Sequence, residues 1–505
     1  MKYHAILLLV FLAQLSVFDY PSETRPEKSA AIVDDHRAQD VEERIRRIES
    51  GLLLPVVVKG ELVASMKLAD RMEFYKTPGV SIAFINNGRI EWTRGYGVRA
   101  VGGNEPVTAE TMFQAGSISK PVAAAIALQM VQNGRLTLDG DVNEKLISWK
   151  VPENEFTKEQ KVTVRRILSH SAGLTNHVAG NYVAGAELPT LVQILNGVKP
   201  ANTPPIRVDI IPGSRWRYSG GGYGVVQQLI VDVAGKPFEK LAQEIIIDRL
   251  KMNHSTFEQP LPEKFRKSAA VGHNRAGEKI QGDWITFPEM AAAGLWSTPS
   301  DLARFALEIQ QSKSGRSNRI LSTQTTDQML TRQIENWGLG FAVDGEGNSA
   351  RFSHGGDTDG YKCFLIMYET TGQGVVIMTN SDRGDRLTDE ILRSIAREYG
   401  WSDFRPKEKT IVKIDPTVYA GYIGNYQFEF SKDFTLAIST QDGNLITELK
   451  QPTGLSKAVL YPESNTKFFR KDVDIELAFV KDDQGRVTHL IFRQDGQDLR
   501  ANRIK

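Results

Sequence analysis

The stretch 114–121 and the apolar run 122–132 behind it constrain this chain most, because together they predict a turn opening directly into a helix. Gly116 allows the turn, and Ser117 and Lys120 are three residues apart, so they share one helical face. The positive end of the helix dipole disfavours an ammonium ion, so it favours a neutral lysine amine. A neutral amine beside a serine hydroxyl activates that hydroxyl for nucleophilic attack. We therefore predict that Ser117 is a nucleophile, with a helix-capping serine as the alternative.

The spacing Ser-x-x-Lys is weak evidence alone, because residues 464–467 contain a second copy among turn residues. A nucleophile also needs a base and an oxyanion hole. The sequence has no G-x-S-x-G elbow, which argues against an α/β-hydrolase, and neither H-E-x-x-H nor paired cysteines, so no metal or other cofactor is predicted. Tyr218 and His354, each followed by glycines, remain as candidate partners for Ser117.

The composition sets wider limits. With 505 residues, 41% hydrophobic and 24% charged, the chain has room for two or more globular domains. A net charge of +1 gives no basic surface for nucleic acid. The single cysteine, Cys363, cannot form an internal disulfide.

The N-terminus predicts export. Lys2 and His4 precede an apolar run over 5–18, which has the length of a signal peptide and is short for a membrane span. We predict a signal peptide over 1–25 and a periplasmic or secreted bacterial protein; an uncleaved anchor is the alternative. No cysteine follows the run, which argues against a lipoprotein, and no later stretch approaches spanning length.

The rest of the chain divides by pattern. Two β-rich runs around Asn87-Gly88 predict a hairpin, helical patterns follow, and strands return before residue 400, so we expect a mixed α/β fold. Short alternating runs after 417, separated by turns such as Asp442-Gly443, predict an all-β barrel or sandwich. The predicted segments are an extension with a short helix (26–60), a main domain (61–401), a linker (402–416) and the β-module (417–505).

Several motifs together resemble the serine β-lactamase-related superfamily over roughly residues 72 to 400. The closest likeness is to the branch of class C β-lactamases, D-alanyl-D-alanine carboxypeptidases, D-aminopeptidases and related esterases. The resemblance implies an α+β fold with an antiparallel sheet and a helical subdomain, and the β-module resembles the lipocalin-like domain appended to such hydrolases. The motifs are Ser117-Ile118-Ser119-Lys120, Tyr218-Ser219-Gly220 and His354-Gly355-Gly356, with flanking likeness at 169–174 and 294–298.

The resemblance also implies roles for single residues. Ser117 would be acylated, Lys120 would shuttle its proton, and Tyr218 would act as general base and then as acid for the leaving group. The backbone N–H groups of Ser117 and Asp357 would form the oxyanion hole. His354, in a triplet with Gly356, would orient the substrate and support Tyr218. His170 is interpreted mainly as structural.

Two departures from the family pattern bear on the substrate. Gly220 replaces the usual asparagine that holds a substrate amide, and His354 replaces the lysine of Lys-Thr-Gly. A neutral histidine anchors a carboxylate poorly. Both departures favour small esters or D-amino-acid amides over lactams.

We therefore predict an exported serine hydrolase that acts through an acyl-enzyme on a small ester, amide or peptide. The alternatives are a cell-wall D-Ala-D-Ala carboxypeptidase or β-lactamase, and a catalytically silent penicillin-binding or partner-binding homologue. The sequence leaves the oligomeric state open.

Overall fold

A computed structural model describes residues 39–176, 180–450, 457–494 and 496–504. The chain divides into two compact units, Met1–Ile45 and Arg46–Lys505. The predicted short helix is found at residues 39–49, whereas the predicted signal peptide lies outside the described residues. Within the described ranges, no helix is both long enough and apolar enough to cross a membrane.

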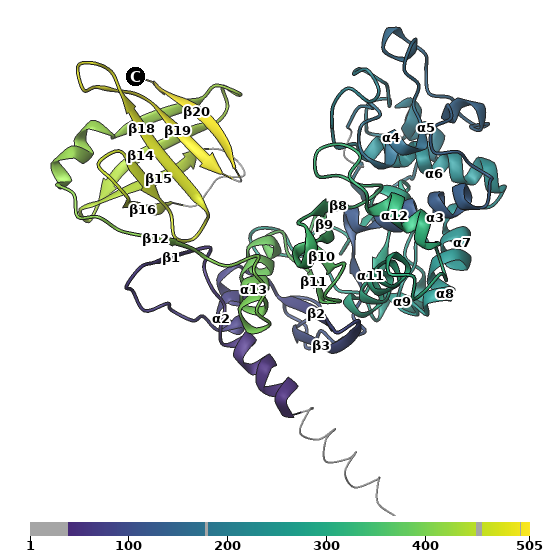
Figure 1. Ribbon diagram of the computed structural model, residues 1–505, viewed down its shortest axis with the longest axis horizontal. Coiled ribbons are helices and arrows are strands. Elements are labelled where there is room, and N and C mark those ends of the chain that lie inside the picture. The colour runs from purple at the N-terminus through teal and green to yellow at the C-terminus, as the bar shows by residue number, and fades with distance from the viewer. Residues whose placement is uncertain (1–38, 177–179, 451–456, 495, 505) are drawn as a thin grey trace, which may run out of the picture. The chain divides into compact units, whose positions relative to one another are not determined.

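A six-stranded antiparallel sheet forms the centre of the main domain (Figure 1). The predicted hairpin is its first two strands, joined at Asn87 and Gly88, whose φ values of 51° and 70° suit a tight hairpin turn. The early hairpin and the later strands join in one sheet, and helices lie between them in the chain, so the mixed α/β prediction is confirmed. In spatial order the strands are β3 (Arg89–Gly97), β2 (Gly79–Asn86), β11 (Gly374–Thr379), β10 (Tyr361–Tyr368), β9 (Arg351–Thr358) and β8 (Ala342–Asp344).

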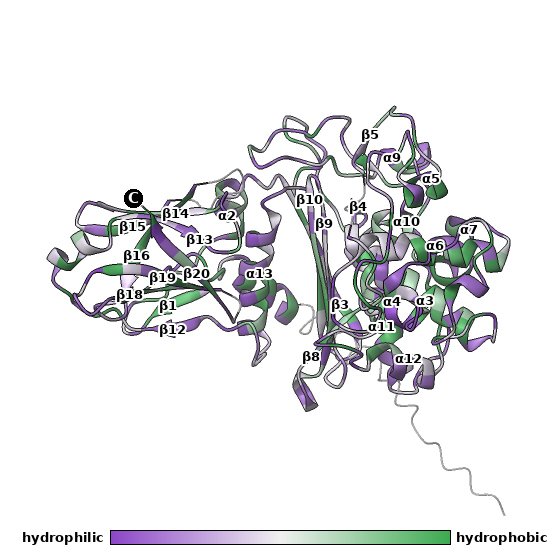
Figure 2. Ribbon diagram, turned by 90° about the horizontal axis from the view of Figure 1, so that it is seen from above, coloured by the Kyte–Doolittle hydropathy of each residue, from purple (hydrophilic) through white to green (hydrophobic). Residues whose placement is uncertain are grey.

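Helices cover both faces of this sheet. Seen edge-on in Figure 2, the sheet lies between α13 on one side and the large helical region containing α11 and α3 on the other. The helices are α2 (Leu68–Phe74), α3 (Ser119–Gln132), α4 (Val164–Leu168), α5 (Leu191–Asn196), α6 (Gly220–Ala234), α7 (Phe238–Ala242), α8 (Asp248–Leu250), α9 (Glu263–Arg266), α10 (Met290–Ala293), α11 (Pro299–Lys313), α12 (Thr323–Leu330) and α13 (Gly384–Glu398).

Helix α3 lies at the centre of the helical region. Its residues from Ser119 to Met130 are all buried, as expected for a helix that is apolar on every side. The alanines at 123–125 and 127 leave room for close packing, and α6 and α10 both contact α3. The buried helix therefore fixes the position of its own N-terminus, where Ser117 and Lys120 are found.

The described residues also form three two-stranded ladders. One strand of the first ladder lies in the predicted linker 402–416, where the sequence patterns indicated no strand, and it pairs in parallel with a strand near the N-terminus. The pairs are β1 (Val56–Val58) with β12 (Lys407–Lys409), β4 (Phe113–Gln114) with β7 (Trp296–Ser297), and β5 (Tyr182–Val183) with β6 (Ile285–Thr286).

The C-terminal module is a closed antiparallel barrel, which confirms the all-β prediction and selects the barrel over the sandwich. Its core combines aliphatic side chains with aromatic ones, among them Tyr422, Tyr426, Phe468 and Phe479. Its strands are β13 (Gly424–Phe428), β14 (Thr435–Gln441), β15 (Asn444–Lys450), β16 (Ala458–Pro462), β17 (Lys467–Phe469), β18 (Ile475–Lys481), β19 (Val487–Gln494) and β20 (Gln497–Ile504).

Candidate active site

Ser117 and Lys120 are in contact, as their helical spacing predicts. Gly116 turns the chain with φ 52°, residues Gly116–Ile118 form a single 3₁₀ turn, and α3 begins at Ser119. The Lys120 Nζ donates to Ser117 Oγ at 2.9 Å. Lys120 is buried, whereas Ser117 is partly exposed, so solvent reaches the serine but hardly the lysine.

A second hydrogen bond holds the Lys120 amine. Its Nζ donates at 2.9 Å to the carbonyl of Ala292, in the short helix α10. Ser119 fastens the same junction, because its hydroxyl donates to the Gly116 carbonyl at 2.6 Å and accepts the Leu295 N–H at 3.0 Å. Sequence reasoning missed both anchors; the likeness at 294–298 was the available signal for this segment.

Tyr218 lies beside this pair, inside a cluster of rings. The Lys120 Nζ is 4.9 Å from the centroid of the Tyr218 ring. His170 packs on Tyr218 with ring centroids 4.3 Å apart, and Trp337 meets it edge-on at 6.1 Å. His354 is 6.5 Å from the same ring. The structure thus brings together Ser117, Lys120, Tyr218 and His354 from three distant segments, and it adds Trp337, which no sequence motif indicated.

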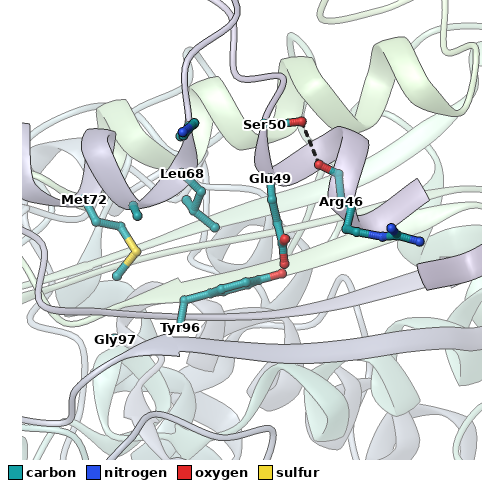
Figure 3. Close-up of a pocket in the computed structure, with 9 residues that line it drawn as sticks. Arg46, Glu49, Ser50, Leu68, Met72, Tyr96 and Gly97 are labelled. Carbon is teal, nitrogen blue, oxygen red and sulfur yellow. Dashed lines mark hydrogen bonds between the residues drawn. The ribbon is translucent and has the colours of Figure 1, made fainter. Parts of the chain in front are cut away.

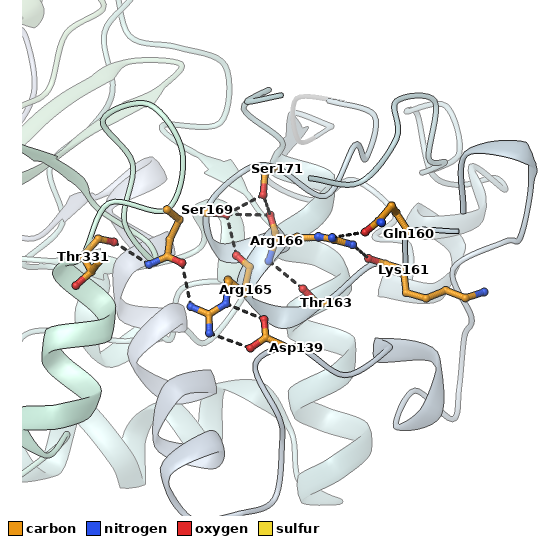
Figure 4. A network of polar contacts seen from close by, with 10 residues as sticks. Asp139, Gln160, Lys161, Thr163, Arg165, Arg166, Ser169, Ser171 and Thr331 are labelled. Atoms are coloured by element: carbon orange, nitrogen blue, oxygen red, sulfur yellow. Dashed lines mark hydrogen bonds and ion pairs between the residues drawn. The ribbon is translucent and has the colours of Figure 1, made fainter. Parts of the chain in front are cut away.

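The position of His170 follows from a braced turn. Its φ of 59° is unusual for a residue with a side chain, and its Nδ1 accepts the N–H of Ser219 at 3.1 Å. The hydroxyls of Ser169 and Ser171 lie 2.9 Å apart across the turn, and Ser169 also donates to the Arg165 carbonyl (Figure 4). These contacts hold the backbone and ring of the Tyr218 motif against His170, and a mainly structural role for His170 stays the prediction.

Arg165 connects this turn to its surroundings. Its guanidinium donates to both carboxylate oxygens of Asp139, at 2.7 and 2.9 Å, and to Gln333 at 2.9 Å (Figure 4). Such a two-pronged ion pair adds directional restraint to charge attraction. The Gln333 N–H donates to the Trp337 carbonyl at 2.8 Å, so the network also reaches the segment that carries Trp337.

His354 is buried within β9. Its Nδ1 lies 2.6 Å from the carbonyl oxygen of Gly355, and in the part of the chain described here its Nε2 has no hydrogen-bond partner. Burial, followed by the nearby Lys120, lowers the pKa of His354 to about 3. The imidazole is therefore neutral in the folded protein and unsuited to anchoring a carboxylate by charge.

We expect His354 to stay neutral in the folded protein throughout the range between about pH 5 and 8. Because its pKa is lowered, protonation favours the unfolded chain, and this histidine weakens folding only as pH falls below its ordinary value of 6.5. Imidazole ¹⁵N shifts measured against pH report the charge directly. A protonation midpoint near 6.5 for His354 in the folded protein would contradict the burial argument.

Gly356 and Asp357 lie against the turn that carries Ser117. A Cβ on Gly356 would fall 2.1 Å from the carbonyl oxygen of Ala115, and a Cβ on Gly116 would fall 2.8 Å from the backbone nitrogen of Asp357. The two backbones approach this closely only because both positions are glycine. The N–H groups of Ser117 and Asp357 thus come from adjoining segments, as an oxyanion hole requires.

Replacing Gly356 by alanine should separate these segments. The added methyl meets backbone that cannot turn aside, so we expect a stability loss of about 1–3 kcal/mol and a larger proportional loss of activity. Gly355→Ala is the matched control, because its Cβ has 4.0 Å to the nearest atom, the carbonyl of Cys363. Melting temperatures and turnover of both variants test the pair; equal effects would show that close approach at Gly356 is not needed.

One ion pair lies beside the candidate site. The carboxylate of Asp357, which is largely exposed, pairs across β9 and β10 with Lys362. Among the described residues there is no cluster of three histidine, cysteine or acidic side chains able to hold a metal ion.

A cavity lies at a distance in sequence from these motifs, next to α2 and β3. It measures about 740 Å³ and is lined by residues including Leu68, Met72 and Tyr96 (Figure 3). Ser117, Lys120 and Tyr218 are absent from its lining. The cavity is therefore separate from the clustered motifs.

Comparison with known proteins assigns the family. The sequence model of the beta-lactamase family matches residues 66–398, about two thirds of the chain. The chain belongs to the beta-lactamase family. This beta-lactamase-fold family consists of serine hydrolases, which confirms the resemblance drawn from the motifs, and the eight-stranded barrel follows the matched region.

Individual relatives are distant. Penicillin-binding protein 4* of Bacillus subtilis is 21% identical over 437 residues, covering 83% of this chain and 93% of its own. Teichoic acid D-alanine hydrolase of Staphylococcus aureus is 21% identical over 313 residues, covering 61% and 75%. The structure of D-amino acid amidase from Ochrobactrum anthropi SV3 matches with a TM-score of 0.55 at 19% identity, covering 71% of this chain and 99% of that one. This last likeness shows a shared fold.

Proposed function

We propose that this member of the family is an exported serine hydrolase that cleaves small esters or D-amino-acid amides through an acyl-enzyme on Ser117. The observation that carries the proposal is the contact of the Lys120 amine with the Ser117 hydroxyl, next to the ring of Tyr218. The apolar run at 5–18 supports export.

In the proposed acylation, Ser117 Oγ forms a bond to the substrate carbonyl carbon. Its proton passes by way of Lys120 to Tyr218 and then to the leaving oxygen or nitrogen, whose bond to that carbon breaks. The N–H groups of Ser117 and Asp357 hold the oxygen as it becomes negative. Water then attacks the acyl-enzyme, the acid is released, and the proton returns to Ser117.

The neutral state of His354 supports esters and amides over lactams. A lactam or a D-Ala-D-Ala peptide carries a carboxylate that needs a cation, and burial keeps His354 uncharged. The names of two relatives, a D-amino acid amidase and a teichoic acid D-alanine hydrolase, support the same substrate class.

A substrate panel tests this ordering. We expect turnover of p-nitrophenyl butyrate and of D-alanine p-nitroanilide to exceed that of nitrocefin and of a D-Ala-D-Ala peptide. The likeness to a penicillin-binding protein favours the second candidate, a cell-wall carboxypeptidase or β-lactamase. Fast lactam turnover without ester cleavage would select that candidate, and no turnover of any substrate would select the silent homologue.

A further inference from the structure

A small, partly open pocket lies at the start of α6, which begins two residues after Tyr218. It measures about 20 Å³, and Thr203, Gly220, Glu289 and Ala292 are among the residues that line it. A cavity of this volume holds one group the size of a water molecule. Ala292 also supplies the carbonyl that accepts from Lys120, so one residue both lines the pocket and contacts the candidate catalytic lysine.

Two polar atoms in this lining lack partners. Glu289 is 5% exposed, and neither its Oε2 nor the Oγ1 of Thr203 has a hydrogen-bond partner within the described residues. Burial raises the pKa of Glu289 to about 7, even though its own backbone and that of Gly180 oppose the rise. A buried carboxylate oxygen without a donor is costly, so its retention needs an explanation.

The chemistry of the lining selects the occupant. A carboxylate oxygen accepts hydrogen bonds and favours positive charge, and a threonine hydroxyl can accept a second bond. A carbonyl or ether group brings no donor, and an apolar group would leave both atoms unpaired. A primary ammonium has the size of a water molecule, three donors and the matching charge.

We propose that this pocket is a subsite for the primary ammonium group of the substrate, with Glu289 as its counter-ion and Thr203 as a second acceptor. The inference rests on the proposed function and narrows it to esters and amides of amino acids whose α-amino group is free. Glu289 is then a residue that determines specificity, and α10 connects it to the carbonyl that holds Lys120.

Binding to the Ser117→Ala protein tests the subsite without turnover. We expect D-alaninamide to bind at least about tenfold more tightly than N-acetyl-D-alaninamide, because acetylation removes the positive charge. In Glu289→Gln we expect the ratio of the two dissociation constants to fall close to one. Glu308→Gln is the matched control: Glu308 is as deeply buried, but its carboxylate accepts from Ser317 and from the Arg319 N–H. We expect this control to keep the ratio.

Thermal unfolding at pH 8 gives a second readout. A carboxylate kept for a ligand destabilises the free protein, so Glu289→Gln should raise the melting temperature, whereas Glu308→Gln should lower it. A melting temperature lowered by Glu289→Gln, with the binding ratio intact, would mean that the pocket holds a resident water only and would overturn the proposal.

The subsite and the proposed function fail in different ways. Turnover of p-nitrophenyl butyrate with equal binding of D-alaninamide and its N-acetyl form, or with neither bound, would overturn the subsite and leave the hydrolase standing. Ammonium binding that depends on Glu289, in a protein that turns over nothing, would overturn the hydrolase and support the subsite.

Discussion

Ser117→Ala is expected to abolish hydrolysis, with a loss of about 10⁴-fold or more in kcat. The hydroxyl is the only atom of Ser117 that the proposed acyl bond uses, and the Lys120 amine that contacts it would be left without a reacting partner. Turnover of p-nitrophenyl butyrate measures the loss, and circular dichroism and the melting temperature check that the fold is kept.

Ser464→Ala is the matched control for this variant, because Ser464 begins the second Ser-x-x-Lys sequence. There the serine hydroxyl accepts the backbone N–H groups of Thr466 and Lys467 in a turn, and the module around it is the barrel. We expect full activity. Activity that survives in Ser117→Ala would show that another residue is the nucleophile.

Tyr218→Phe is expected to lower kcat by about 10²- to 10⁴-fold, the usual contribution of a general acid–base group. The change removes only the hydroxyl, and the ring contacts with His170 and Trp337 that position it can persist. The melting temperature should therefore change little. Steady-state kinetics on an ester and on a D-amino-acid amide measure the loss for both leaving groups.

Tyr223→Phe provides the comparison, because Tyr223 is a second tyrosine near Lys120, with its ring centroid 5.7 Å from Nζ. It is fully buried and donates to the Leu168 carbonyl at 3.2 Å, and burial raises its pKa well above the ordinary value. Its loss should cost about 1 kcal/mol of stability and little kcat. If the two variants exchanged these effects, Tyr223 would be the acid–base group.

The local parts of the site could be predicted from sequence because they depend on short spacings. A three-residue separation at a helix start places Ser117 against Lys120, and Asn87-Gly88 specifies a hairpin turn. Turn signals between short alternating runs likewise indicated the C-terminal β-module. These features need no knowledge of distant segments.

The remaining parts depend on tertiary packing. Trp337 and His170 flank the Tyr218 ring from segments more than 160 residues apart, and no periodicity links them. The strand in the predicted linker forms because β1 supplies a partner about 350 residues away. The buried state of Glu289 likewise depends on how α6 and α10 pack, so its unpaired oxygen cannot be found in the sequence.

Covalent labelling tests the central claim most directly. The intact protein is incubated with a fluorophosphonate, its mass is measured, and the modified peptide is sequenced by mass spectrometry. We predict one adduct, located on Ser117, and none in Ser117→Ala. An unmodified protein, or an adduct on any other residue, would contradict the assignment of Ser117 as the nucleophile.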